Sequence, residues 1–235
     1  MPFTFTVFSY LFSASIAWFL GIRLYKNFKI NYTVTKNSIF ASSFIGAALI
    51  GLSLFIYGVS SFFAPLNLSI LKIGYILGHT NFFIAFAVLI NGTNHFFENN
   101  KLLKITPILI LLANAVLTGI NILYYPFVNP SIDKYNLIHW GQPFVPRIVF
   151  LALMLMAAGI ISMVFFIKRP KDENLKLKSL SMSLAFMTAG LGGGLICFLD
   201  SSFGLFMSYL SLVVGFSLAL IASFIEEKQG IKKEE

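Results

Sequence analysis

Seven long apolar segments constrain this chain more than any other feature of its sequence. Each runs for about 20 residues or more, which is the length an α-helix needs to cross a hydrocarbon core about 30 Å thick. Of the 235 residues 57% are hydrophobic and only 11% are charged, so little of the chain remains for a soluble domain. The predicted segments are residues 3–25, 39–63, 70–90, 105–127, 144–167, 179–199 and 203–225.

These segments predict an all-α integral membrane bundle of seven transmembrane helices. Residues 1–225 form one seven-helix transmembrane domain, and residues 226–235 form a charged cytoplasmic tail. Of the Lys and Arg residues, 14 fall on one side of the seven segments and three on the other. The positive-inside rule therefore places the N-terminus outside and the C-terminus in the cytoplasm. We expect a multi-pass protein of the cell membrane.

The basic loops indicate what the chain contacts. The net charge of +8 is carried by short connections between apolar segments. At such positions the expected partners are the lipid bilayer and the anionic lipid headgroups on the cytoplasmic side. The sequence therefore gives no support to binding of nucleic acid.

The third segment places polar side chains inside an otherwise apolar helix. Lys72, Tyr75 and His79 follow an i, i+3, i+7 spacing and share one helix face. Polar groups in hydrocarbon cost free energy, so they usually face a bundle interior, a water-filled cavity or a partner. This segment is the first place to look for function.

A second polar stripe lies in the fourth segment, and two opposite charges lie at the outer ends of the fifth and sixth. Together they predict an outward-facing polar pocket among the third, fourth, fifth and sixth segments, for a small ligand or a proton. The candidate ligand-binding residues are Lys72, Tyr75, His79, Asn114, Thr118, Asn121, Arg147 and Asp200.

Each of these side chains has alternative interpretations. Three interpretations are open for His79: a hydrogen bond within the bundle, sensing of a ligand or a proton near neutral pH, or ligation of a metal or haem. For Lys72 and Arg147 the alternatives are extension of the side chain to the membrane surface, binding of an anion, or pairing with Asp200. The stripe that begins at Asn114 either hydrogen-bonds a neighbouring helix or contacts a ligand.

Several kinds of chemistry are disfavoured by what the sequence lacks. Membrane haem and zinc sites usually need more than one buried histidine, and only His79 lies at membrane depth. A retinal pigment needs a lysine in the last segment, which has none. The single cysteine, Cys197, allows neither an intramolecular disulfide nor a cysteine-based metal site. We therefore predict no metal, no cofactor and no catalytic residue, and favour a non-enzymatic protein.

The sixth segment contains a glycine cluster, AGLGGGL, at residues 189–195. A nucleotide-binding fingerprint requires a strand before the glycines and a helix opening at them, and neither is expected here. Small residues at Ala185, Ala189 and Gly193 instead predict close helix packing or a local unwinding. Direct contact of this backbone with a ligand is the alternative.

The longest outer loop, residues 128–143, carries aromatic residues beside polar ones. Such a composition is typical of an aromatic belt at the membrane interface. The alternative is a lid over the outer mouth of the bundle.

The third segment, LKIGYILGHTNFFIAFAVLI, has a lysine shortly before a Gly and a Tyr and then an apolar run that contains Phe. With the short outer loops, one longer outer connection and the charged end FIEEKQGIKKEE, the chain resembles the seven-transmembrane N-terminal sensory region of bacterial histidine kinases. The resemblance implies a sensor that transmits through its seventh helix. The main departure from that family is that we expect no kinase or coiled coil after Glu235. Either a separate cytoplasmic signalling partner carries the output, or the chain is not a signalling input.

These features lead to a membrane-embedded sensor or receptor-like module as the predicted function. A small-solute transporter or channel is the alternative, and an intramembrane enzyme is the third hypothesis. A transporter should carry polar residues in its inner half as well, whereas here that half is mostly Phe, Leu, Ile and Ser. The apolar inner half favours the sensor.

Overall fold

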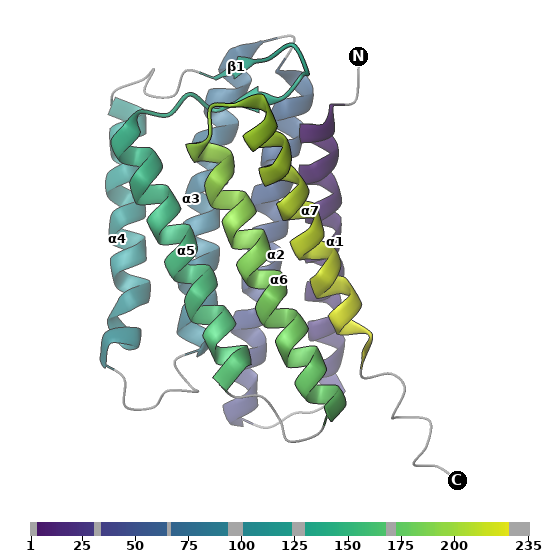
Figure 1. The fold of residues 1–235 in the computed structure, drawn as a ribbon. Coiled ribbons are helices and arrows are strands. Elements are labelled where there is room, and N and C mark those ends of the chain that lie inside the picture. The colour runs from purple at the N-terminus through teal and green to yellow at the C-terminus, as the bar shows by residue number, and fades with distance from the viewer. Residues whose placement is uncertain are drawn as a thin grey trace.

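A computed structural model describes residues 4–30, 34–64, 67–93, 101–123, 130–167 and 173–225 of the chain. Within these ranges the chain forms seven α-helices that lie side by side along one axis (Figure 1). A short hairpin and the first turn of α1 lie at one end of the bundle, which we call the hairpin end. The helices are α1 (Phe5–Ile30), α2 (Val34–Phe63), α3 (Leu68–Thr93), α4 (Lys101–Leu123), α5 (Phe144–Ile167), α6 (Glu173–Phe198) and α7 (Ser202–Ser223).

The all-helical fold and the seven helices agree with the prediction from the apolar segments. The only strands in the described residues form the hairpin between α4 and α5. Its strands are β1 (Ser131–Ile132) and β2 (Ile138–His139), which pair antiparallel. The predicted end of the fourth segment, residues 124–127, lies outside the described residues.

Six of the helices are long and apolar enough to cross a membrane: α1, α2, α3, α5, α6 and α7. The apolar part of α4 is shorter and covers Lys104–Ile120. Large apolar side chains are exposed on the outer faces of the helices, such as Leu77, Met163 and Ile221. Exposed apolar surface of this extent marks contact with lipid rather than water. The protein is therefore a multi-pass membrane protein.

The same six helices form a closed ring. Each of α1, α2, α3, α5, α6 and α7 packs against the next in that order, and α7 returns to α1. The seam between α3 and α5 is the least extensive contact in this ring. Among the described residues α4 packs extensively only against α3, so it lies beside the ring and is not a member of it.

Glycines hold α6 close to both of its neighbours. A Cβ added at Gly190 would lie 2.3 Å from the Cβ of Ala158 in α5, and one at Gly192 would lie 2.7 Å from the backbone of α7. On α7, a Cβ added at Gly215 would lie 2.5 Å from the backbone nitrogen of Ala189. The glycine cluster is thus a packing surface, as small residues at helix interfaces usually are. Because α6 stays helical through the cluster, the local unwinding that was considered does not occur.

Gly215→Ala tests this close packing. The added methyl group cannot be accommodated against the backbone of α6 unless the two helices separate, and overpacking of this kind costs about 1–3 kcal/mol. We expect a lower thermal unfolding midpoint for the purified protein in detergent. The matched control is Gly159→Ala in α5, where an added Cβ meets nothing within 4 Å. A Gly215→Ala protein as stable as the control would contradict the packing described here.

Candidate functional site

The loop after α4 folds into the ring at the hairpin end. The side chains of Leu137, Ile138, Trp140 and Gln142 are at most 3% exposed. Gly141 has a φ of 61°, a left-handed conformation that glycine adopts without strain. The loop is therefore a plug in the mouth of the ring. Trp140 therefore lies inside the mouth of the ring, whereas Tyr135 of the same loop is exposed at its surface.

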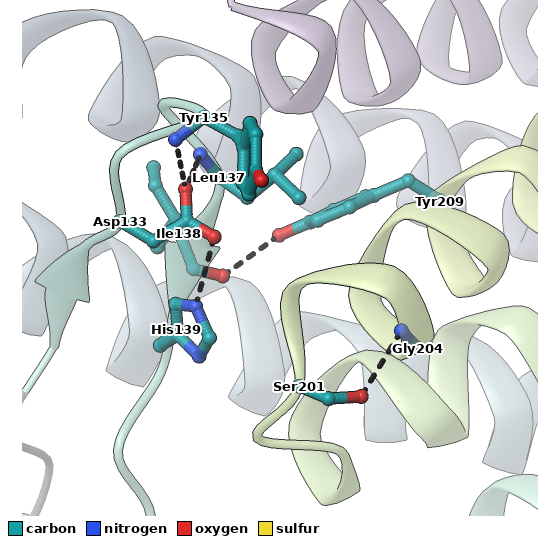
Figure 2. A network of polar contacts seen from close by, with 8 residues as sticks. All are labelled: Asp133, Tyr135, Leu137, Ile138, His139, Ser201, Gly204 and Tyr209. Atoms are coloured by element: carbon teal, nitrogen blue, oxygen red, sulfur yellow. Dashed lines mark hydrogen bonds and ion pairs between the residues drawn. The ribbon is translucent and has the colours of Figure 1, made fainter.

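Asp133 organises the hairpin turn (Figure 2). One carboxylate oxygen accepts hydrogen bonds from the backbone N–H groups of Tyr135 at 2.8 Å and Leu137 at 2.9 Å. The other lies 3.3 Å from Nε2 of His139. Asn136 takes a left-handed φ of 59°, which asparagine tolerates in turns. A single carboxylate therefore fixes the shape of the turn.

The hairpin is tied to the ring through two aromatic side chains. The Tyr209 hydroxyl of α7 donates to the backbone oxygen of Ile138 at 3.3 Å (Figure 2). Trp140 Nε1 donates to the hydroxyl of Tyr10 in α1 at 3.2 Å. The plug is thus joined to α1 and α7, which close the ring.

His79 lies at the centre of the ring, just beneath the plug. Its Nδ1 is hydrogen-bonded to the Tyr57 hydroxyl of α2, and its Nε2 lies 3.5 Å from the amide nitrogen of Gln142 and 3.9 Å from Sγ of Cys197 in α6. Its ring packs on Tyr75, with centroids 3.8 Å apart, and on Phe150 of α5 at 4.3 Å. We call these six residues the His79 cluster. They come from α2, α3, α5, α6 and the plug.

The neighbours of His79 assign its tautomer. Nε2 faces the amide nitrogen of Gln142, a donor, so Nε2 carries the lone pair. Nδ1 therefore carries the hydrogen and donates it to the Tyr57 hydroxyl. In this arrangement the amide oxygen of Gln142, a residue only 1% exposed, has no hydrogen-bond partner among the described residues. A buried acceptor without a partner is costly, so its presence beside His79 needs an explanation.

A cavity of about 20 Å³ lies next to this cluster, enough for one water molecule. Trp140 covers it, and each of the six ring helices contributes to its wall, whereas α4 contributes none of the lining residues. The wall is almost entirely aromatic and aliphatic. The lining residues are Tyr10, Leu54, Tyr57, His79, Phe82, Trp140, Phe150, Met154, Gly193, Ile196, Cys197 and Leu212.

The structure separates the polar stripe of α4 from His79. Asn114 donates to the backbone oxygen of Thr80 at 3.2 Å, and the hydroxyls of Thr118 and Thr80 lie 2.9 Å apart. These bonds join α4 to the side of α3 that faces away from the ring, so the interhelical interpretation applies to them. The side chain of Asn121 lies outside the described residues. Neither Asn114 nor Thr118 lines the cavity beside His79.

Lys72 is half-buried on α3 and does not line the cavity. Arg147 and Asp200 do meet, because Nη1 of Arg147 lies 2.5 Å from a carboxylate oxygen of Asp200. The Arg147 guanidinium also donates to the backbone oxygens of Phe198, at 3.4 Å, and of Gln142. Since Asp200 is largely exposed, the ion pair adds little stability. The guanidinium instead holds the backbone of Gln142 against the end of α6.

Sequence reasoning missed several members of the site. Tyr57, Tyr10 and Cys197 occupy apolar stretches where nothing marked them as special, and Trp140 and Gln142 were placed in a surface loop. One signal was available for Cys197, since it lies three residues from Asp200 at the outer end of its segment. Gln142 could have been noticed as a polar residue between Trp140 and a proline.

Comparison of the chain with protein families, with curated proteins and with solved structures finds no match in any of the three. The function must therefore be inferred from the site itself. The described residues contain no group of three or more His, Cys, Asp or Glu side chains arranged to hold a metal ion. Among the aromatic rings that line the cavity, the site offers the imidazole of His79, the thiol of Cys197 and the thioether of Met154.

The hairpin generates a pH-dependent prediction. Burial raises the pKa of Asp133, but hydrogen bonds from Ser202, the Leu137 amide, His139 and the Tyr135 amide outweigh it and lower the pKa below its usual value of 3.8. A lowered folded pKa contributes stability that is fully present above the unfolded value and is lost as the pH falls through the folded value.

Trp140 reports on this loss. In a Trp18→Phe background it is the only tryptophan, and we expect its fluorescence to be constant above about pH 5 and to shift to the red below about pH 4, as the hairpin loosens. Asp133→Asn should abolish this acid transition, while Asp200→Asn, which changes an exposed carboxylate at the same end, should retain it. An unchanged acid transition in Asp133→Asn would exclude the proposed role of that carboxylate.

Proposed function

We propose that this protein is a membrane-embedded sensor or receptor-like module, and that its stimulus acts on the His79 cluster. One observation carries the proposal: a single buried imidazole contacts side chains from α2, α5, α6 and the plug. The cavity beside it draws on every helix of the ring. A ligand that changes the contacts of His79 therefore changes the packing of the whole ring at once.

In this proposal all seven helices span the membrane and the hairpin end faces outward. The excess of Lys and Arg at the opposite end supports that orientation through the positive-inside rule. An odd number of spans places the two ends of the chain on opposite sides. The signal received beneath the plug then travels along α7 to a separate cytoplasmic partner. The resemblance to sensory regions of bacterial histidine kinases agrees with this assignment.

A small-solute transporter has less support. Between the cavity and the far end of the bundle, the ring is filled by buried apolar side chains, among them Phe83, Phe86, Ile90 and Ile161. Two buried serines of that half, Ser162 and Ser179, each donate to a backbone oxygen of the neighbouring helix, so their hydroxyls are used in helix packing. A transporter would need to open a path through this packed core, whereas a sensor needs only to repack it.

Tyr57→Phe tests whether the His79 cluster controls the far end of α7. The substitution removes the hydroxyl bound to His79 and retains the ring, at a cost of about 1–3 kcal/mol for the group left without a partner. We expect faster hydrogen–deuterium exchange in the last turns of α7, residues 216–223, as well as near Tyr57. The matched control is Tyr135→Phe, because Tyr135 is an exposed tyrosine of the hairpin. Changes confined to the neighbourhood of Tyr57 would overturn the proposed transmission.

The orientation has its own test. An epitope added before the N-terminus should be accessible to antibody on intact cells, and one added after Glu235 only after the cells are permeabilised. This result is expected because the basic connections hold the opposite end in the cytoplasm. Access to both epitopes on intact cells, or to the C-terminal one alone, would contradict the orientation.

A further inference from the structure

Two soft side chains line the cavity together with His79. Sγ of Cys197 lies 3.9 Å from Nε2 of His79. Met154 reaches the same cavity from α5 and is 2% exposed. Its terminal methyl packs over Gly193, one helical turn before Cys197, where an added Cβ would lie 2.7 Å away. An imidazole nitrogen, a thiol and a thioether thus border one small buried space.

The spacing of the first two donors suits a shared metal ion. A metal bound at about 2.0 Å from a histidine nitrogen and about 2.3 Å from a cysteine sulfur, at a trigonal angle, holds those two atoms about 3.7 Å apart. The structure has 3.9 Å. A metal would therefore fit between Nε2 and Sγ without movement of α3 or α6.

The surroundings of His79 also resemble those of a metal ligand. A histidine that binds a metal through one ring nitrogen usually donates the other N–H to a fixed partner, which orients the ring. Here Nδ1–H donates to Tyr57, and the lone pair of Nε2 is directed toward Cys197 and Gln142.

The donor set selects the type of ion. None of the residues that line the cavity is an Asp or a Glu, whose carboxylates are the usual ligands of hard cations. Thiolate and thioether sulfur favour copper(I) among biological metals. When Cu⁺ binds, the Cys197 thiol releases its proton and an S–Cu bond forms, so the charges of thiolate and Cu⁺ cancel. Zn²⁺ with the same ligands would leave a net positive charge in an apolar core, which is costly.

We propose that the cavity beside the His79 cluster binds one copper(I) ion through Nε2 of His79, Sγ of Cys197 and Sδ of Met154. The ion is the ligand of the sensor, and that part of the inference rests on the proposed function. The proposal departs from the expectation of no metal, which rested on the single cysteine and on the single histidine at membrane depth. Only the folded ring brings the three donors together.

The test uses the purified full-length protein in detergent under anaerobic conditions, with copper(I) titrated against a chromophoric copper(I) chelator. We expect one tightly bound copper(I) per chain. Removal of a residue that only orients a metal ligand costs about 10–100-fold in metal affinity, and removal of a ligand itself should cost at least as much. We therefore expect the copper(I) affinity to fall at least about 100-fold in Cys197→Ser and at least about 10-fold in Met154→Leu.

Matched controls are available on the same elements. Met156→Leu changes an exposed methionine of α5, and His139→Gln changes a hairpin histidine, so both should keep the wild-type affinity. Equal affinity in Cys197→Ser and wild type would overturn the site. So would the absence of stoichiometric binding by wild type.

X-ray absorption at the copper edge of the wild-type complex keeps the proposal testable even if a variant fails to fold. We expect two sulfur neighbours near 2.3 Å and one nitrogen near 2.0 Å. A shell of oxygen and nitrogen alone would overturn the proposed ligands.

The site and the sensor can fail separately. Copper(I) should change hydrogen–deuterium exchange in the last turns of α7. Copper binding without that change overturns the ion's role as the sensor's ligand. Absence of copper binding, together with altered α7 exchange in Tyr57→Phe, overturns the copper site and supports the sensor.

Discussion

The hydrogen bond between His79 and Tyr57 is the interaction on which the hairpin half of the ring depends. A neutral imidazole inside an apolar bundle has no water to bond, so both of its nitrogens need partners from the protein. Tyr57 binds one nitrogen, and the amide of Gln142 approaches the other. Phe150 stacks on the same imidazole across the seam between α3 and α5, where the ring is least extensively packed. The site therefore also joins two weakly connected helices.

The plug makes this arrangement possible. It delivers Gln142 and Trp140 into the ring, and it is held there from two directions. Asp133 fixes the hairpin turn from one side, while Arg147 secures the backbone of Gln142 from the other. Since Arg147 also bonds the carbonyl of Phe198, beside Cys197, the plug and the end of α6 are positioned together. A change at the site is thus connected to the hairpin, to α5 and to α6.

The sequence predicted the fold well and the site partly. Helix positions followed from apolar segments of spanning length, because that pattern needs no knowledge of neighbours. The burial of Tyr75 and His79 followed from the cost of polar groups in hydrocarbon. The stripe of Asn114 and Thr118 does bond the third helix, which was one of its two interpretations, but it does so at Thr80 and not at His79. Periodicity gives the polar face of a helix but not the residues that this face meets on its neighbour. The pairing of Arg147 with Asp200 was one of several alternatives until the structure placed them together.

By itself, the sequence determined that this is an all-helical membrane protein with one polar helix among apolar ones. Tertiary structure alone decided that six helices close into a ring, that α4 lies beside it, and that the loop before α5 enters its mouth. It also decided that Cys197 and Met154 border the cavity of His79. The physical reason is that local hydrophobicity fixes which residues avoid water, while the glycine contacts of α6 and the partners of buried polar groups fix which helices lie together.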